Sequence, residues 1–151
     1  MEIHITRTIA APPETVWAVI TDIPNSPQVI SGIDSVDMLG GPEGFGVGTR
    51  WRETRTMFGK EATEEMEVSA AAPGASYSVV AASHGMRYES TFTLQPTSAD
   101  ACTLIMVFEG EPTSAVSRAM AATIGRLFVG QTRKALAKDL EDIAAASEAQ
   151  A

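Results

Sequence analysis

Alternation of apolar and polar residues predicts strands over much of the chain. Ile3, Ile5 and Ile9 alternate with polar residues near the start, and a period of two is typical of a half-buried strand. The stretch from Thr49 to Glu109 repeats such patterns. It is divided by turn signals at Phe58-Gly59, Pro73-Gly74, His84-Gly85 and residues 96–100. We therefore expect one strand at the start and five strands between 49 and 109.

Helical patterns flank these strands. Pro13 suits the first turn of a helix with Val16, Trp17 and Ile20 on one face. Residues 22–31 contain two prolines, which favour short broken turns, and residues 33–39 fit a short strand. The segment from about 113 to 143 lacks proline and predicts a long helix. Its apolar face is Val116, Met120, Ile124, Leu127, Gln131, Leu136, Leu140 and Ile143.

This order of elements predicts a single α+β domain, with helices against one face of a curved antiparallel sheet. We expect the domain to span residues 1–146. Residues 147–151 continue a run rich in alanine, serine and glutamine, and we expect them to form a frayed tail.

The first hairpin indicates which side of the sheet faces inward. A two-residue turn at Phe58-Gly59 would place Arg52 opposite Glu65 and Arg50 opposite Glu67. Complementary charges in cross-strand pairs are typical of a solvated outer face. The other side would pair Trp51 with Met66, Arg55 with Ala62, and Glu53 with Glu64.

Two further turns give the same inner face. A type II turn at 72–75 would place Val68 opposite Val79 and Glu64 opposite Ser83. A two-residue turn at 84–85 would place Ala81 opposite Tyr88. Most of the inner face is then apolar: Trp51, Val68, Val79, Phe92, Met106 and Phe108. One end is polar and carries Glu53, Arg55, Glu64, Ser83 and Tyr88.

The sequence also resembles a known superfamily. The resemblance is carried by APPETVWAVITDIPNSPQVI, by GVGTRWRETRTMFGKEAT and by the last helix through ALAKDLEDI. These segments resemble START-like (SRPBCC) proteins, and among them bacterial polyketide cyclase/dehydrase-like proteins. The resemblance implies a helix-grip fold, with a curved sheet wrapped around the C-terminal helix and an apolar cavity between them. Members of the superfamily bind lipids, sterols, polyketides or hormones, some catalyse cyclisation or dehydration, and others assist chaperones.

The charge and residue composition of the chain limits the classes of partner that it could bind. The chain has 11 basic and 19 acidic residues, a net charge of −8, which is a poor match for nucleic acid or anionic lipid. Cys102 is the single cysteine and the two histidines lie far apart, so we expect no disulfide, metal or cofactor. The first residues lack a signal-peptide pattern, and no apolar run approaches the roughly 20 residues of a membrane span. We expect a cytoplasmic monomer or homodimer that binds a small hydrophobic molecule.

Glu53, Glu64 and Arg55 form the sharpest candidate constellation. Opposed carboxylates raise their affinity for protons, whereas an adjacent arginine lowers it. Such a pair beside an apolar pocket suits general acid–base chemistry, with Glu53 or Glu64 as the candidate catalytic residue. The alternative is an ordinary ion-pair network at a water-exposed rim.

We expect a ligand to contact a wider set of inner-face and helix residues. The set is Trp51, Glu53, Arg55, Glu64, Met66, Ser83, Tyr88, Ser90, Phe92, Met106, Phe108, Met120 and Ile124. A triad of Ser83, His84 and Glu64 is rejected, because neighbouring residues at a strand end and turn point apart. The two distant histidines, His4 and His84, and the single cysteine, Cys102, cannot form a metal site together.

Glycines mark two further features. The loop GGPEGFGVG at 40–48 lacks the lysine and the strand–turn–helix context of a phosphate-binding loop. It fits either a lid over the cavity or a surface loop. Gly125 and Gly130 are each unfavourable inside a helix by about 1 kcal/mol, and they would permit either a close approach or a kink.

Three functions remain open from the sequence. The first is binding of a hydrophobic or amphipathic small molecule, polyketide- or lipid-like, between sheet and helix. The second is a polyketide cyclase or dehydratase that uses the same acids. The third is a protein-binding module of the chaperone-activator type, for which the charged outer face offers no apolar patch.

Overall fold

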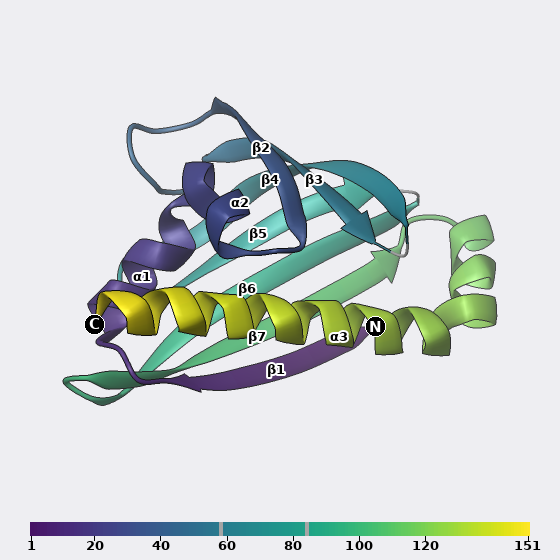
Figure 1. Ribbon diagram of the computed structural model, residues 1–151. Coiled ribbons are helices and arrows are strands. Elements are labelled where there is room, and N and C mark those ends of the chain that lie inside the picture. The colour runs from purple at the N-terminus through teal and green to yellow at the C-terminus, as the bar shows by residue number, and fades with distance from the viewer. Residues whose placement is uncertain (58, 84) are drawn as a thin grey trace.

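The computed structural model describes residues 1–57, 59–83 and 85–151, apart from the side chain at position 124. Seven antiparallel strands form one sheet in the order β1-β7-β6-β5-β4-β3-β2. The sheet curves around the long helix α3, which crosses its inner face (Figure 1). The elements are β1 (Glu2–Ile9), α1 (Pro13–Thr21), the 3₁₀ turn η1 (Ile23–Asn25), α2 (Ser26–Val29), β2 (Ile33–Gly40), β3 (Arg50–Met57), β4 (Lys60–Ala72), β5 (Ser76–Ser83), β6 (Met86–Ser98), β7 (Ala101–Pro112) and α3 (Ala115–Gln150).

The register around the first hairpin confirms the predicted inner face. Arg52 pairs with Glu65, and Trp51 pairs with Met66. Trp51 is 4% exposed, whereas the side chains of Arg50 and Arg52 are about half exposed. The turn at Phe58 lies outside the described residues, but the flanking pair of Met57 and Lys60 has the predicted register.

The β4–β5 hairpin has the predicted turn with one correction. Ala75 N–H donates to the Ala72 carbonyl at 2.9 Å, and Gly74 has a φ of +78°, as a type II turn requires. The tip nevertheless pairs Ala72 with Ser76, one residue beyond the predicted register. A register shift between Val68 and Ala70 then restores the pairing of Val68 with Val79. A β-bulge absorbs the extra residue, so the inner face is unchanged.

Helix α3 differs from the prediction at its far end. It continues to Gln150, where a frayed tail was expected. Ser147 is fully buried there, and the Glu148 carboxylate accepts a hydrogen bond from Ala10 N–H at 3.0 Å. Helix α1 also packs against α3, and these tertiary contacts hold the last turns in place.

The first half of α3 also departs from the predicted apolar face. Val116, Met120 and Leu127 are 71%, 61% and 69% exposed, so they do not pack on the sheet. Figure 1 shows the first turns of α3, in pale green, at a steep angle to the rest of the helix. Among the described residues, nothing lies within 4 Å of a Cβ built on Gly125 or Gly130. These glycines therefore fit a bend better than a close approach.

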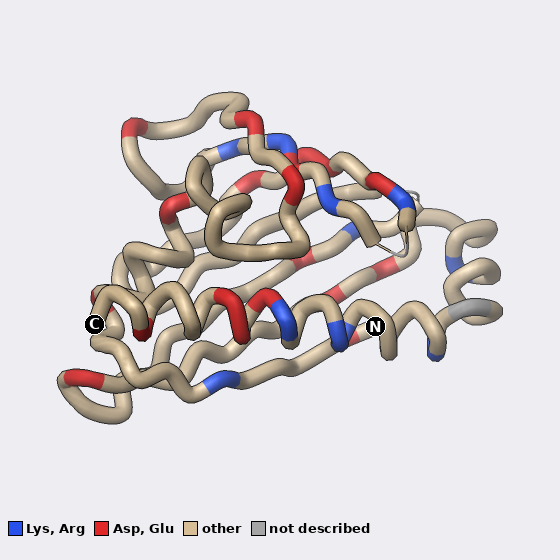
Figure 2. Tube along the Cα trace, viewed as in Figure 1, with Lys and Arg blue, Asp and Glu red and all other residues tan. Residues whose placement is uncertain are grey.

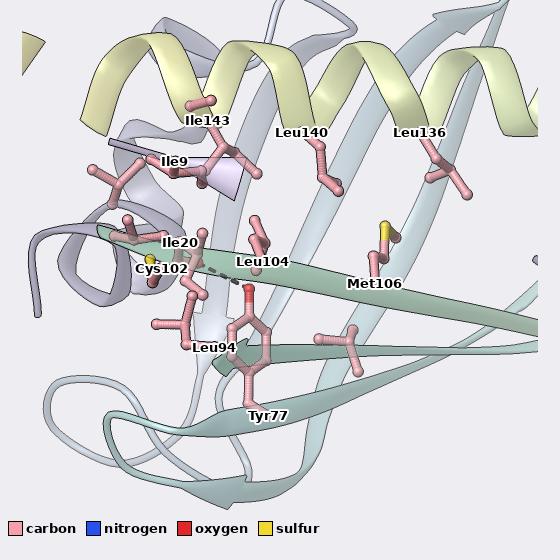
Figure 3. Packing of buried hydrophobic residues seen from close by; sticks show 14 of the residues in the cluster. Ile9, Ile20, Tyr77, Leu94, Cys102, Leu104, Met106, Leu136, Leu140 and Ile143 are labelled. Carbon is pink, nitrogen blue, oxygen red and sulfur yellow. Dashed lines mark hydrogen bonds between the residues drawn. The ribbon is translucent and has the colours of Figure 1, made fainter. Parts of the chain in front are cut away.

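The hydrophobic core is concentrated where the second half of α3 covers the sheet (Figure 3). Ile9, Leu104 and Leu140 are fully buried between β1, β7 and α3. The Tyr77 hydroxyl donates to the Ile20 carbonyl at 2.9 Å, and so connects β5 to α1. Phe45 anchors the 40–48 loop to this region through an edge-to-face contact with Tyr77 at 4.8 Å.

Candidate functional site

The inner face of the sheet has two ends with different exposure. The packed end is defined by Ile9, Ile20, Tyr77, Leu94, Leu104 and Leu140, which are all buried. The open end is defined by Glu64, Met66, Ser83, Tyr88, Ser90 and Phe108, which are all half-buried. Strand β6 connects the two ends. Its residue Leu94 pairs with Leu104 of β7 at the packed end, and its residue Tyr88 pairs with Gly110 of β7 at the open end.

A buried ion cluster joins strand β3 to helix α3. Arg55 Nε donates to Glu53 Oε2 at 2.8 Å. The Arg55 guanidinium also contacts both oxygens of Asp139, at 3.2 and 2.9 Å. Trp51 Nε1 donates to the second oxygen of Glu53 at 3.2 Å. Glu53 and Asp139 are 8% and 6% exposed, so the expectation of a water-exposed rim is wrong for this part of the constellation.

Charge in this cluster is unbalanced, with one guanidinium between two carboxylates. Burial alone would lower the pKa of Arg55, but Asp139 and Glu53 outweigh it and raise that pKa above its ordinary value. Burial also raises the pKa of Asp139, against the opposing effect of Arg55. Arg55 therefore stays charged, and Asp139 takes up a proton more readily than an ordinary aspartate does.

Asp139 is the member of the cluster that the sequence prediction missed. It lies between Leu136 and Leu140 on the buried face of α3, and a charged residue within that apolar stripe was the available signal. The segment before β2 covers the ion pair, because a Cβ built on Gly32 would lie 3.3 Å from Arg55 Nη1. The cluster thus fastens β3 and this segment to α3.

Glu64 lies opposite Glu53 as predicted, but its surroundings differ. Its side chain is half-buried, and among the described residues no hydrogen bond to its carboxylate is found. Met66, two residues from Glu64 on the same face of β4, pairs with Ala81, which in turn pairs with Tyr88. Burial and the charge of Glu64 both raise the pKa of Tyr88. Tyr88 also stacks on Phe108 with ring centroids 5.4 Å apart.

The other predicted site residues are spread along the inner face. Met106 is 4% exposed, and Phe92 stacks on Tyr77 at 5.1 Å, next to the packed end. Ser83 and Ser90 belong to the open end. Met120 is 61% exposed on the first half of α3. The side chain of Ile124 and the rejected triad residue His84 lie outside the described part of the chain.

The outer face carries the predicted charge pairs. Arg52 contacts Glu65 at 3.1 Å, and Arg50 lies 3.9 Å from Glu67, all with exposed side chains. A shallow depression of about 410 Å³ lies beside them and reaches Arg87 on β6. Exposed pairs of this kind contribute little stability, and they present a polar surface.

Within residues 1–57, 59–83 and 85–151, no three His, Cys, Asp or Glu side chains are grouped to hold a metal ion. None of the helices in this part of the chain is long and apolar enough to cross a membrane.

Comparison with known proteins places the chain in a family. Residues 1–148 match the family of polyketide cyclases/dehydrases and lipid transport proteins. No curated protein sequence matches the chain.

Solved structures show the same fold at low sequence identity. A protein from Thermus thermophilus has a TM-score of 0.83 at 18% identity, covering 100% of this chain and 99% of that one. The Zhui aromatase/cyclase from Streptomyces sp. R1128 has a TM-score of 0.85 at 13% identity, covering 99% and 94%. Norcoclaurine synthase from Thalictrum flavum, solved with dopamine and hydroxybenzaldehyde, has a TM-score of 0.73 at 18% identity, covering 95% and 84%. The predicted START-like helix-grip fold is confirmed.

Proposed function

This chain belongs to the polyketide cyclase/dehydrase and lipid transport family, and on that premise we propose that it binds a hydrophobic or amphipathic small molecule, polyketide- or lipid-like, at the open end of the inner face. The observation that carries the proposal is the exposure of this end. Met66, Tyr88 and Phe108 lie on the face that forms the core elsewhere, yet each is half-buried. Apolar groups left in water on a concave face are available to a ligand.

Apolar contact would supply most of the binding free energy, at about 25 cal/mol per Å² of buried ligand carbon before the costs of association. The polar groups at the open end would orient the ligand. Glu64, Ser83 and Ser90 are the half-buried polar side chains beside the apolar groups. Arg55 is held by Glu53 and Asp139, so its guanidinium serves the buried cluster and shapes one wall.

Two neighbouring alanines on β5 provide a matched test. Ala81 pairs with Met66 and Tyr88 on the inner face, whereas Ala82 is exposed on the outer face. In Ala81→Trp the indole would fill the open end, and in Ala82→Trp it would point into solvent. Native mass spectrometry of freshly purified protein should show a co-purified small molecule in the parent protein and in Ala82→Trp. It should be absent, or reduced at least about tenfold, in Ala81→Trp.

Two results would contradict the proposal. One is the same bound mass in both variants, which would place the ligand elsewhere. The other is a parent protein that carries no small molecule and fails to bind the neutral apolar dye Nile red. Circular dichroism would verify that both variants are folded before either result is used.

A second candidate function is catalysis of cyclisation or dehydration by the same site. It is favoured by Glu64, which is half-buried and shares the open end of the inner face with Tyr88. A carboxylate and a phenol beside a carbonyl-rich ligand are suited to proton transfer. Glu53 is less available, because both its oxygens accept hydrogen bonds from Trp51 and Arg55.

Conservative substitutions separate catalysis from binding. Glu64→Gln should abolish conversion of the co-purified ligand while the ligand remains bound, and Glu53→Gln should have a smaller effect. Glu65→Gln, on the outer face of the same strand, is the control and should change neither property. Product formation followed by liquid chromatography and mass spectrometry would measure this. Undiminished turnover in both Glu64→Gln and Glu53→Gln would rule out the acid–base role.

A further inference from the structure

The first half of α3 presents large apolar side chains to solvent. Val116, Met120 and Leu127 are the most exposed large apolar side chains among the described residues, at 71%, 61% and 69%. Val116 and Met120 lie about one turn apart on the first turns of α3, and Leu127 follows between the two glycines of the bend. No described element of the fold covers these three side chains.

Local contacts hold this part of the helix in place. Ser114 and Ser117 form a reciprocal capping box at the helix start. Thr113 N–H donates to the Gly85 carbonyl at 2.8 Å, and a Cβ built on Gly85 would lie 2.9 Å from Ser117 Cβ. The start of α3 is therefore packed against Gly85, just before strand β6, and the exposed apolar residues face outward.

Charge is segregated along the same helix. Every charged residue from 115 to 138 is basic: Arg118, Arg126, Arg133, Lys134 and Lys138. The rest of the chain holds the other 6 of the 11 basic residues and all 19 acidic residues. Figure 2 shows this separation, with blue positions along the first part of α3 and red positions elsewhere. The net charge of −8 therefore conceals a strongly basic segment.

We propose that the first half of α3 docks on an anionic lipid surface. The exposed apolar side chains would enter the interface between headgroups and acyl chains, while the positive charges of Arg118 and Arg126, elsewhere around the helix, would attract the anionic surface. Lipid phosphates attract basic segments close to the surface. Repulsion from the acidic body is limited, because salt screens charges beyond about 8 Å and this half of the helix extends past the sheet (Figure 1).

Charge complementarity favours a lipid surface over a second copy of the chain. Two copies that paired their exposed apolar residues would bring two basic helices together, and like charges at such close range are unfavourable. An anionic surface neutralises the same residues. This inference is independent of the proposed ligand site, because it rests on residues that lie outside the open end.

Vesicle flotation tests the proposal directly. The protein should float with phosphatidylcholine vesicles that contain phosphatidylglycerol, and bind them at least about tenfold more tightly than phosphatidylcholine alone. Arg118→Gln with Arg126→Gln should remove this preference. Met120→Ser with Leu127→Ser should weaken binding to both vesicle types by about tenfold or more.

Matched controls use exposed residues of the same types elsewhere. Arg7→Gln on β1 and Met38→Ser on β2, where Met38 is 46% exposed, should bind as the parent protein does. Equal binding to neutral and anionic vesicles, equal loss in the controls, or no flotation of the parent protein would each overturn the proposal. So would a dimer, seen by sedimentation, that Met120→Ser with Leu127→Ser dissociates. The ligand measured by native mass spectrometry should persist in Arg118→Gln with Arg126→Gln, which separates this test from that of the ligand site.

Discussion

The packed end and the open end of the inner face are built by the same strands but have different surroundings. On β6, Leu94 is buried at the packed end, whereas Tyr88 and Ser90 are half-buried at the open end. Helix α3 causes this difference. Its second half covers the packed end with Leu140, while its first half leaves the sheet at an angle (Figure 1). The proposed site lies where the covering helix departs, and stability and binding should therefore respond to substitutions at different ends.

The largest expected effect is at the packed end, on the second half of α3. Leu140 is fully buried, and Leu140→Ala should lower the free energy of unfolding by about 3–4 kcal/mol through lost apolar contacts and a residual cavity. Leu127→Ala, on the exposed first half, should change it by less than about 0.5 kcal/mol. Urea denaturation of both variants measures the difference. Equal losses would mean that the two halves of α3 are covered alike, contrary to the comparison.

The ion cluster of Glu53, Arg55 and Asp139 should have the next largest effect. Arg55→Met would leave the carboxylates of Glu53 and Asp139 buried without their cation, at a cost of about 2–3 kcal/mol near neutral pH. Arg52→Met, on the outer face of the same strand, should cost less than about 1 kcal/mol, because its exposed partner Glu65 is solvated without it.

The pH dependence identifies the origin of this loss. The destabilisation by Arg55→Met should shrink at acidic pH, where Asp139, whose pKa is raised by burial, takes up a proton and loses its charge. Urea midpoints measured near pH 7 and near pH 4 would show this. A loss that is the same at both pH values, or no larger than that of Arg52→Met, would mean that the cluster contributes packing alone.

The sequence predicted the strands and their inner face because hairpin register depends on local turns. The pairing of Trp51 with Met66 follows from the first turn. Even with the bulge in β4, the same residues of β4 and β5 face inward. Asp139 was missed for a different reason. Its contact with Arg55 spans 84 positions along the chain, and no local pattern states where a helix crosses a sheet.

Helix α3 shows the same limit on prediction. Periodicity indicated an apolar face from Val116 to Ile143, but periodicity does not reveal what covers a face. The first part of that face is exposed, and the expected frayed tail is instead fixed by the contact of Glu148 with Ala10. Both outcomes depend on tertiary contacts rather than on helix propensity.

The two tyrosines offer a smaller and more specific comparison, with one at each end. Tyr77→Phe would leave the buried Ile20 carbonyl without its donor at 2.9 Å, at a cost of about 1–2 kcal/mol. Tyr88→Phe removes a half-buried hydroxyl at the open end, and should change the free energy of unfolding by less than about 0.5 kcal/mol. Thermal and urea denaturation test the first effect.

Ligand retention should respond in the opposite order. Tyr88→Phe should reduce the co-purified ligand measured by native mass spectrometry, because Tyr88 is one of the half-buried residues of the proposed site. Tyr77→Phe should retain that ligand in its folded fraction, since its hydroxyl is directed toward α1 (Figure 3). If Tyr77→Phe loses the ligand and Tyr88→Phe keeps it, the ligand occupies the packed end and the assignment of the site is wrong.

The smallest expected effect is a difference in how stability depends on pH at two aspartates of α3, Asp139 and Asp142. Burial raises the pKa of Asp139, so the folded state binds its proton more tightly than the unfolded state does. The stability gained from that proton is complete below the ordinary pKa of about 3.9 and is lost as pH rises through the folded value. For Asp142, burial is outweighed by hydrogen bonds from Lys138 and Ser31, and the pKa is lowered. Its contribution is complete above the ordinary pKa and is lost as pH falls through the folded value.

Asparagine substitutions should therefore give opposite pH trends. Asp142→Asn should destabilise the protein by up to about 1 kcal/mol near pH 6 and by less near pH 3, since the lost contacts lie at the surface. Asp139→Asn should be more harmful near pH 3 than near pH 6, because only the parent residue gains from protonation on folding. Urea midpoints measured between these pH values would resolve the two slopes. Parallel slopes would show that Asp139 titrates as a solvated residue, and the ion cluster that joins β3 to α3 would then be open to water.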